Sequence, residues 1–238
     1  MSMKFPMNVL IASCLIWASH LQKLRAGEQE FPVWEDYIEN VETQELESDE
    51  VFPLHPDIDK VYLALGWDPA KDGKSIDIDS NIHVLKGSRV TKRISYKNLT
   101  YSTGKFYSTK LIEHKGDNLT GKGEGDDETI VVHLKKIAKN KKKITDLVGS
   151  IVSFSGETFD TLSNAFCRIY VIEKGQEKEL ARISLNDLGS VRGLVFANFH
   201  REKDGTWYFK AIVETKENAK VAANLDREIL QLKNSSQL

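Results

Sequence analysis

Cysteine is scarce in this chain, which carries two such residues among 238. Cys14 and Cys167 lie far apart in sequence, so they provide neither a disulfide framework nor the paired spacing of a zinc site. Because Cys167 stands inside an apolar run, we expect it to be a small buried hydrophobic residue.

Net charge is also small, at −2, and this excludes the strong basic field that marks many nucleic-acid-binding proteins. We therefore expect no nucleic-acid partner. Aliphatic and aromatic residues make up 40% of the chain, enough for a sizeable core. The length fits one domain with extensions, or two small domains.

The chain has no long hydrophobic run. Its N-terminus holds an apolar stretch of roughly a dozen residues, too short for an ordinary membrane span but typical of a signal-peptide core. A secreted protein with a cleaved signal peptide and a protein with an uncleaved apolar extension both fit. Residues 27–50 are strongly acidic, which favours a solvated linker or a loosely held helix. We therefore assign residues 1–50 to an N-terminal extension and 51–238 to the folded domain.

Short segments rich in β-branched and aromatic residues recur along the domain, with turn residues between them. Asp204-Gly205 separates two of them and indicates a hairpin. This spacing predicts an all-β fold, an antiparallel β-sandwich. We expect strands within 59–67, 81–87, 93–99, 129–134, 144–155, 164–173, 181–185, 193–202 and 206–214, with Trp67, Trp207, Tyr208 and Phe209 as core and strand residues rather than a ligand cage.

Two further segments depart from this pattern. Val221, Leu225, Ile229 and Leu232 recur at helical spacing, which predicts a C-terminal helix docked on the sandwich or, alternatively, a partner-binding helix. The lysine-rich segment 135–143 is interpreted as a solvated connection between strands, with a phosphate- or membrane-facing patch as the alternative.

The segment Gly116 to Glu128 reads GDNLTGKGEGDDE and combines five acidic residues with four glycines. The glycines let the backbone adopt positive φ and turn sharply, so that several oxygens can face one point. Calcium takes six to eight oxygen ligands at about 2.3–2.6 Å. A bound divalent cation would offset the repulsion among the carboxylates, whereas an acidic disordered loop is the alternative interpretation.

A second acidic pair lies upstream, at Asp77 and Asp79. On a strand, residues two apart point to the same side. The D-x-D-x-N order resembles the start of an EF-hand, but Ile82 and Ser88 occupy the positions of its glycine and bidentate glutamate. We therefore predict a composite site shared with the loop. Because no cysteine lies near, calcium, or more weakly magnesium, is favoured over zinc or copper.

Four stretches in order carry a family resemblance: LGWD at 65–68, DIDSN at 77–81, the loop at 116–128 and FDTLSNAFCRIYV at 159–171. Over roughly residues 51–215, the sequence resembles the TerD family of tellurium-resistance and stress-response proteins. Leu119 and Lys122 depart from the family pattern at positions that tend to be polar or acidic, which makes the local field slightly less negative.

The resemblance implies a β-sandwich that binds calcium ions and works with a protein partner. It also implies a cytoplasmic setting alongside membrane-associated partners, and association of this chain itself with a membrane stays open. Asp68 matches a strand-end aspartate whose role we expect to be structural. The metal-site residues that the resemblance implies are Asp77, Asp79, Asp117, Asn118, Glu124, Asp126, Asp127 and Glu128.

Three functional hypotheses follow. The first is a calcium-binding sensor or scaffold without enzymatic activity. The second is a small-ligand-binding protein, for which some eukaryotic members suggest cyclic AMP. The third is a metal-dependent phosphohydrolase, with His114 and His133 near the loop, although neither a nucleophile elbow nor a phosphate loop is present. The arginines available for a phosphate in the second case are Arg168, Arg182, Arg192 and Arg201.

Overall fold

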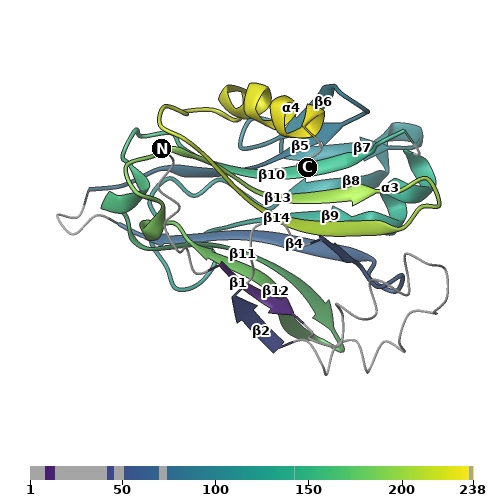
Figure 1. Cartoon of the computed structure of the whole chain (residues 1–238), viewed down its shortest axis with the longest axis horizontal. Helices are drawn as coiled ribbons and strands as arrows, with labels where there is room; N and C mark the ends of the chain where they lie inside the picture. Colours follow the sequence, from purple (N-terminus) through teal and green to yellow (C-terminus); the bar gives the residue numbers. More distant parts are fainter. Residues whose placement is uncertain (1–8, 14–41, 46–50, 70–73, 142, 236–237) are drawn as a thin grey trace.

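Two antiparallel β-sheets packed face to face form the structure, a computed structural model that describes residues 9–13, 42–45, 51–69, 74–141, 143–235 and 238 (Figure 1). The eight-stranded sheet has the order β2-β1-β12-β11-β4-β9-β8-β7, and the six-stranded sheet has the order β3-β14-β13-β10-β5-β6. All-β architecture and the sandwich are therefore confirmed.

The strands of the first sheet are β1 (Val9–Ser13), β2 (Glu42–Glu45), β4 (Lys60–Asp68), β7 (Thr100–Thr103), β8 (Thr109–His114), β9 (Glu128–His133), β11 (Ser163–Glu173) and β12 (Gln176–Ser184). Those of the second are β3 (Val51–Pro53), β5 (Ile78–Leu85), β6 (Val90–Ile94), β10 (Asp146–Ser153), β13 (Gly193–Arg201) and β14 (Trp207–Lys216). Short 3₁₀ turns occupy Lys105–Tyr107, Phe159–Thr161, Asn186–Leu188 and Ala222–Leu225.

The core lies between the two sheets, where alternate side chains of each strand face inward. Leu63, Leu65 and Trp67 enter it from β4, and Phe199 and Phe209 enter from the opposite layer. The sulfur of Cys167 is also buried there, as expected, and burial raises the pKa of its thiol. Trp207 is a core residue, whereas Tyr208 faces the outer side of its sheet. Cys14 lies outside the described residues.

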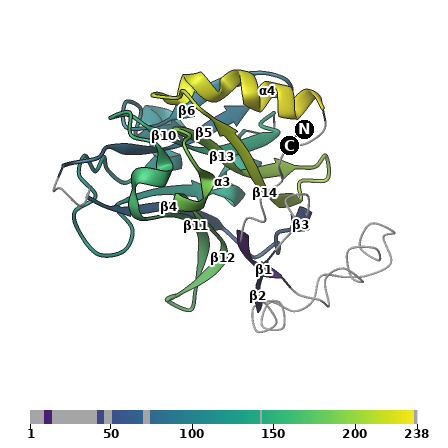
Figure 2. The same cartoon turned by 60° about the vertical axis from the view of Figure 1, so that its left-hand side comes forward.

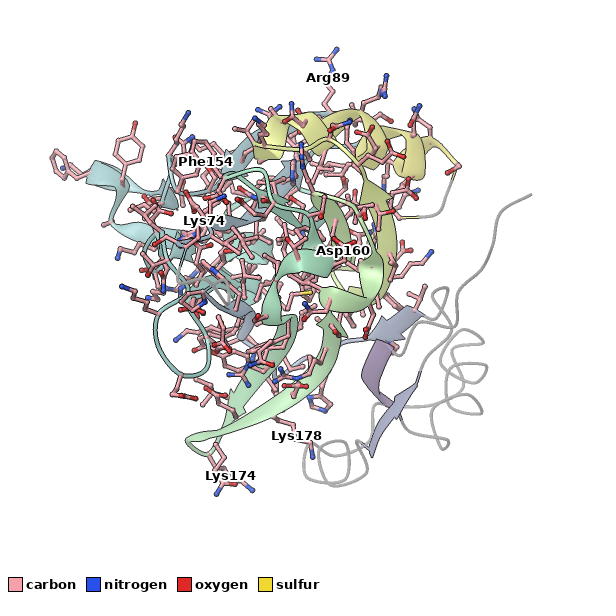
Figure 3. All side chains as sticks on the ribbon, turned by 90° about the vertical axis from the view of Figure 1, so that its left-hand side faces the viewer. Lys74, Arg89, Phe154, Asp160, Lys174 and Lys178 are labelled. Carbon is pink, nitrogen blue, oxygen red and sulfur yellow. The ribbon has the colours of Figure 1, made fainter. Side chains whose placement is uncertain are left out.

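The β13–β14 hairpin turns at the predicted place. The Gly205 amide donates to the Glu202 carbonyl at 3.0 Å, and the Thr206 amide donates to the Asp204 carboxylate at 2.8 Å. Gly205 has φ +103°, a conformation that favours glycine. Figure 3 shows a second hairpin, β11–β12, which projects away from the six-stranded sheet with Lys174 at its tip.

Helix α4 (Asp226–Asn234) covers the outer face of the six-stranded sheet (Figure 2). Leu225, Ile229 and Leu232 are buried against outward side chains such as Val148 and Ile212. This confirms the predicted docked helix, although Val221 lies before its first turn. Helix α4 thereby shields from water the apolar outer face of this sheet, which would be exposed in a sandwich of two sheets alone.

The lysine-rich segment differs from the prediction of a plain solvated connection. Residues Leu134–Asn140 form helix α3, because Leu134 and Ile137 lie on one face and are buried in the core. Lys135 and Lys139 point away from that face and are exposed. In the described part of the chain, no helix has the length and apolar character needed to cross a bilayer.

Parts of the predicted extension also form strands. Residues of β1 pair with β12, and β2 pairs with β1, so 9–13 and 42–45 extend the eight-stranded sheet. The acidic stretch was expected to be a linker or loose helix, and within 42–45 this is wrong. The rest of the predicted signal peptide and acidic linker lies outside the described residues.

Candidate metal centre

The two acidic segments meet at one end of the sandwich. Asp79 lies on β5 of the six-stranded sheet and Asp77 immediately precedes that strand. The acidic loop instead connects β8 to β9 in the eight-stranded sheet. The site is therefore built from both layers, and the convergence that the sequence predicted is present.

Three carboxylates form its centre. One oxygen from each of Asp77, Asp79 and Asp117 lies within 4.8 Å of the other two. Asp79 is 2% exposed, whereas Asp117 is open to solvent at the mouth of the site. Asp77 is held by the residue that follows β10, because its carbonyl accepts the Phe154 amide at 3.0 Å. Figure 3 shows Phe154 and Lys74 on the same side of the molecule.

Several oxygens here lack partners. Oδ1 of Asp77, Oδ2 of Asp79 and Oδ1 of Asn81 are all buried, and none has a hydrogen-bond partner among the described residues. An unsatisfied buried oxygen is costly, and a charged one more so. An all-oxygen donor set of this kind suits a hard cation such as calcium. The residues present thus fit the ion that the sequence suggested.

Electrostatics point the same way. Burial, reinforced by the charges of Asp117 and Glu128, raises the pKa of Asp77 to about 6. Burial also raises the pKa of Asp79 to about 8, with further contributions from Glu128, Asp77 and Asp117, which exceed the opposing effect of Lys97. Burial and the neighbouring carboxylates thus both oppose the ionisation of these two carboxyl groups.

Glu128 is the first residue of β9 and borders the site on its buried side. Its Oε2 accepts hydrogen bonds from the amide and hydroxyl of Ser80, both at 2.8 Å, and lies 3.4 Å from His114 Nε2. Its Oε1 accepts the Asn118 amide at 3.3 Å. Glu128 thus joins β5, β8 and the loop, and its charge lies beside the three central carboxylates.

The side chains of Asn118 and Asp127 bond within the loop and to β4, and a ligand role for either stays a prediction. The Asn118 Oδ1 accepts from the amides of Thr120 and Gly121 at 3.0 and 3.1 Å, a turn typical of asparagine. Its Nδ2 donates to Asp127 Oδ1 at 2.6 Å. The other Asp127 oxygen accepts the Trp67 amide at 2.9 Å, which ties the loop's end to β4.

Trp67 is the residue around which this region packs. Its indole nitrogen donates to the Ile76 carbonyl at 2.8 Å, directly before Asp77. A Cβ on Gly121 would lie 2.4 Å from the same ring, and one on Gly66 would lie 2.4 Å from the Gly125 carbonyl. Only glycine permits these approaches, so the LGWD segment and the loop are shaped to each other.

The structure places two predicted ligands away from the trio. Asp126 forms a two-pronged pair with Arg168, at 2.8 Å to Nε and 2.7 Å to Nη2. Glu124 is exposed to solvent on the loop. A ligand role for either stays a prediction. Arg168 and Arg182, which the sequence offered as phosphate ligands, are both ion-paired with glutamates of β12.

Asp126→Asn is expected to leave calcium affinity within about twofold of wild type, because its carboxylate faces Arg168. It should lower the unfolding free energy by roughly 1.5–3 kcal/mol, the range for hydrogen bonds to charged groups. Calorimetry and thermal melts measure the two effects separately. A loss of affinity comparable to that of an Asp77 variant would return Asp126 to the ligand set.

Ser80 and Asn81 also border the site, although neither was among the predicted ligands. The alternation that places Asp77 and Asp79 on one side extends to Asn81, so the sequence pattern was sufficient to predict Asn81 as a site residue. The bond between Ser80 and Glu128 joins residues 48 apart and crosses the two sheets. No local pattern predicts such a contact.

A sequence profile of the TerD domain matches residues 43–223. The chain belongs to the TerD domain family. The match begins within β2, includes β3 and both acidic segments, and ends within the 3₁₀ turn before α4.

Curated TerD relatives have names that concern resistance and stress. The chain is 34% identical over 166 residues to tellurium resistance protein TerZ of Serratia marcescens, covering 65% of this chain and 79% of that protein. It is 33% identical over 165 residues to general stress protein 16U of Bacillus subtilis (strain 168), covering 66% and 81%. The TerD domain here is thus of the tellurium-resistance and stress-response type.

The fold agrees with solved TerD structures. A homologue of telluride resistance protein (TerD) from Streptomyces coelicolor A3(2) superposes with a TM-score of 0.58, at 18% sequence identity. The superposition covers 73% of this chain and 98% of that one. At this identity the likeness concerns the fold alone.

Proposed function

We propose that this TerD domain is a calcium-binding module that acts as a sensor or scaffold, without catalysing a reaction. The supporting observation is the trio of Asp77, Asp79 and Asp117, in which Asp77 and Asp79 each have a buried carboxylate oxygen without a partner among the described residues. These residues, with Glu128 beside them, would hold the ion. A bound ion supplies positive charge that offsets the repulsion among the carboxylates.

A scaffold role is supported by the position of the site. The loop presents Leu119 to solvent, two residues from Asp117 of the proposed site. Ordering of the loop by calcium would therefore fix a surface that a protein partner contacts. A hydrolytic role is less well supported, because His114 is buried and faces Ser80 and Glu128.

Calorimetric titration of the full chain with calcium tests this proposal. We expect saturable binding, and a melting temperature that rises by roughly 5–10 °C at a hundredfold excess over the dissociation constant, since that excess contributes about 2.7 kcal/mol. Magnesium should give a smaller rise. Heats and melting temperatures that do not change with calcium would contradict the proposal.

The pH dependence of the metal-free protein offers a second measurement. A carboxyl group whose pKa is raised on folding binds more protons in the folded state, so its contribution to stability falls as pH rises from the unfolded to the folded pKa. For Asp77 and Asp79 this window runs from about 4 to about 8. The pKa of His83 is lowered to about 3 by burial and gives the opposite slope below about pH 6.5.

Comparing the unfolding free energy of wild type with that of Asp79→Asn cancels the pH dependence that other groups, such as His83, contribute to both proteins. The unfolding free energy of wild type minus that of the variant is expected to decrease from pH 4 to pH 8 in EDTA. With saturating calcium, this decrease should be abolished, because the ion competes with the proton. Chemical denaturation at several pH values checks both, and a flat difference in EDTA would contradict the electrostatic account.

A further inference from the structure

A short turn at the edge of the eight-stranded sheet exposes two aromatic rings. This turn, residues 104–108, joins β7 to β8 and is called the hairpin tip below, and β7 is the last strand of its sheet. Phe106 is 88% exposed and Tyr107 is 78% exposed, more than any other large hydrophobic side chain among the described residues. Two adjacent rings left in water on a projecting turn indicate a contact surface.

The backbone of the hairpin tip holds both rings outward. Phe106 and Tyr107 each have φ +55°, a left-handed conformation that bulky residues rarely adopt. The Tyr107 amide donates to the Gly104 carbonyl at 3.1 Å, and the Ser108 amide donates to the Lys105 carbonyl at 3.3 Å, so the turn is closed by its own backbone. Backbone strain of this kind is concentrated at binding sites, and here it accompanies two solvent-exposed rings.

The lysine-rich segment lies at the same end of the molecule as the hairpin tip. Strands β8 and β9 are antiparallel, so the start of β8, which follows the tip, is beside the end of β9, which leads into α3. Lys141 Nζ lies 5.9 Å from the centre of the Tyr101 ring on β7. Figure 1 shows α3 and the β7–β8 hairpin at one end of the sandwich. Because the acidic loop joins the other ends of β8 and β9, lysines and carboxylates are segregated.

Several cations at this end are available to a partner. Residues 135–143 contain six lysines and no acidic residue. Lys105, Lys139 and Lys143 are exposed, and none of them forms an ion pair within the described part of the chain. Lys105 Nζ lies 5.5 Å from the centre of the Phe106 ring, which places a positive charge beside the exposed aromatic group. The hairpin tip and residues 135–143 together are called the basic end below.

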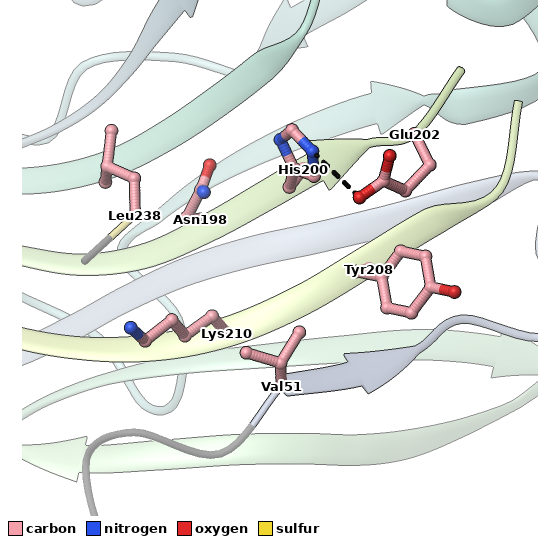
Figure 4. Close-up of a pocket in the computed structure, with 7 residues that line it drawn as sticks. All are labelled: Val51, Asn198, His200, Glu202, Tyr208, Lys210 and Leu238. Carbon is pink, nitrogen blue, oxygen red and sulfur yellow. Dashed lines mark ion pairs between the residues drawn. The ribbon is translucent and has the colours of Figure 1, made fainter. Parts of the chain in front are cut away.

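The carboxylates nearby do not cancel the charge of the basic end. Asp57 lies 3.9 Å from Lys135 and offsets that lysine alone. The β13–β14 turn also packs near α3, but its residues 201–204 read REKD and carry no net charge. Within that turn, Glu202 Oε1 lies 3.6 Å from His200 Nε2, at the edge of a pocket on the other sheet (Figure 4). The basic end therefore keeps a positive charge.

We infer that the basic end docks on the surface of an anionic lipid bilayer, with the rings of Phe106 and Tyr107 inserted between the headgroups. Aromatic side chains favour the membrane–water interface, and negative headgroups attract lysines beside it. A protein–protein interface of ordinary size buries about 800 Å² on each partner. A convex turn with two rings offers much less area, whereas it fits between lipid headgroups. The carboxylate trio, at the opposite end, then faces away from the bilayer.

Co-sedimentation of the full chain with lipid vesicles tests this inference. The vesicles contain phosphatidylcholine alone or phosphatidylcholine mixed with phosphatidylserine, and EDTA is present. We expect binding to the mixed vesicles, much weaker binding to phosphatidylcholine alone, and loss of binding as salt is raised, because salt screens the lysines. Lys139→Gln combined with Lys143→Gln should weaken binding more than about tenfold, since one lysine near an anionic surface is worth about fivefold in affinity.

Phe106→Asn combined with Tyr107→Asn removes both rings. Asparagine tolerates the left-handed backbone, so the melting temperature should not fall, whereas vesicle binding should weaken at least about tenfold. Leu119→Asn is the matched control, because it removes an exposed apolar side chain from the acidic loop at the opposite end, and it should bind like wild type. Asp79→Asn should also bind vesicles like wild type, which separates this inference from the calcium proposal.

Two kinds of result would overturn the docking of the basic end. The first is vesicle binding that requires calcium, or that the folded variant without both rings retains. The second is the absence of binding to anionic vesicles at low salt, a result that would favour a protein partner for the exposed rings.

Discussion

Replacing Asp79 with asparagine is expected to stabilise the metal-free protein while abolishing its response to calcium. The carboxylate of Asp79 is almost fully buried, lies among other acids and has an oxygen without a partner. Removing its charge at pH 8 should raise the unfolding free energy by about 1–3 kcal/mol, and the melting temperature by several degrees. Such opposite effects identify a residue kept for binding at the expense of stability.

The experiment compares thermal melts of wild type and Asp79→Asn in EDTA and in excess calcium. Wild type should gain several degrees from calcium and the variant should gain none. Glu124→Gln is the matched control, since it removes one charge from an exposed position of the acidic loop between β8 and β9. If Asp79→Asn destabilised the metal-free protein, the account of a repulsive, partner-poor site would be wrong.

Gly121→Ala is expected to have the largest structural effect in the loop. Gly121 has φ +60°, and an added Cβ would meet the Trp67 ring at 2.4 Å and its carbonyl at 2.8 Å. The left-handed backbone costs about 1–2 kcal/mol for alanine, and overpacking adds about 1–3 kcal/mol. We therefore expect a total loss of about 2–5 kcal/mol and at least tenfold weaker calcium binding.

Gly125→Ala supplies the comparison within the same loop. Its φ is +87°, but nothing lies within 4 Å of an added Cβ, so only the backbone cost applies. Denaturant titration should give a loss of about 1–2 kcal/mol, and calcium affinity should change little. Equal losses for the two variants would show that contact with Trp67 does not hold the loop.

The sandwich was predictable where strands are buried and apolar. All side chains of β10 are buried, and those of β13 are buried apart from its last two residues, and both strands contain the β-branched or aromatic residues that indicate a strand. The sequences of β7 and β8, TYST and TKLIEH, are polar on one side and lie at the end of their sheet, so the strand signal is weak. Helix α3 is too short for its two core residues to show a period.

The sequence predicted which kinds of residue form the candidate site, but not which of them lie close together. Dense acids and glycines indicated an oxygen-rich loop, and the spacing of Asp77 and Asp79 indicated a common side. What no spacing shows is that Asp117 reaches the pair, whereas Asp126 turns toward Arg168 on β11. That division depends on strand pairing between distant segments, which local sequence does not encode.

The carboxylates come from opposite layers, since β5 belongs to one sheet and the β8–β9 loop to the other. An ion held between them would link the two sheets at this end of the sandwich. Amide hydrogen exchange should therefore slow in β5 and β9 together when calcium is added, although these strands share no ladder. Forcing the layers apart at this rim would require releasing the ion first.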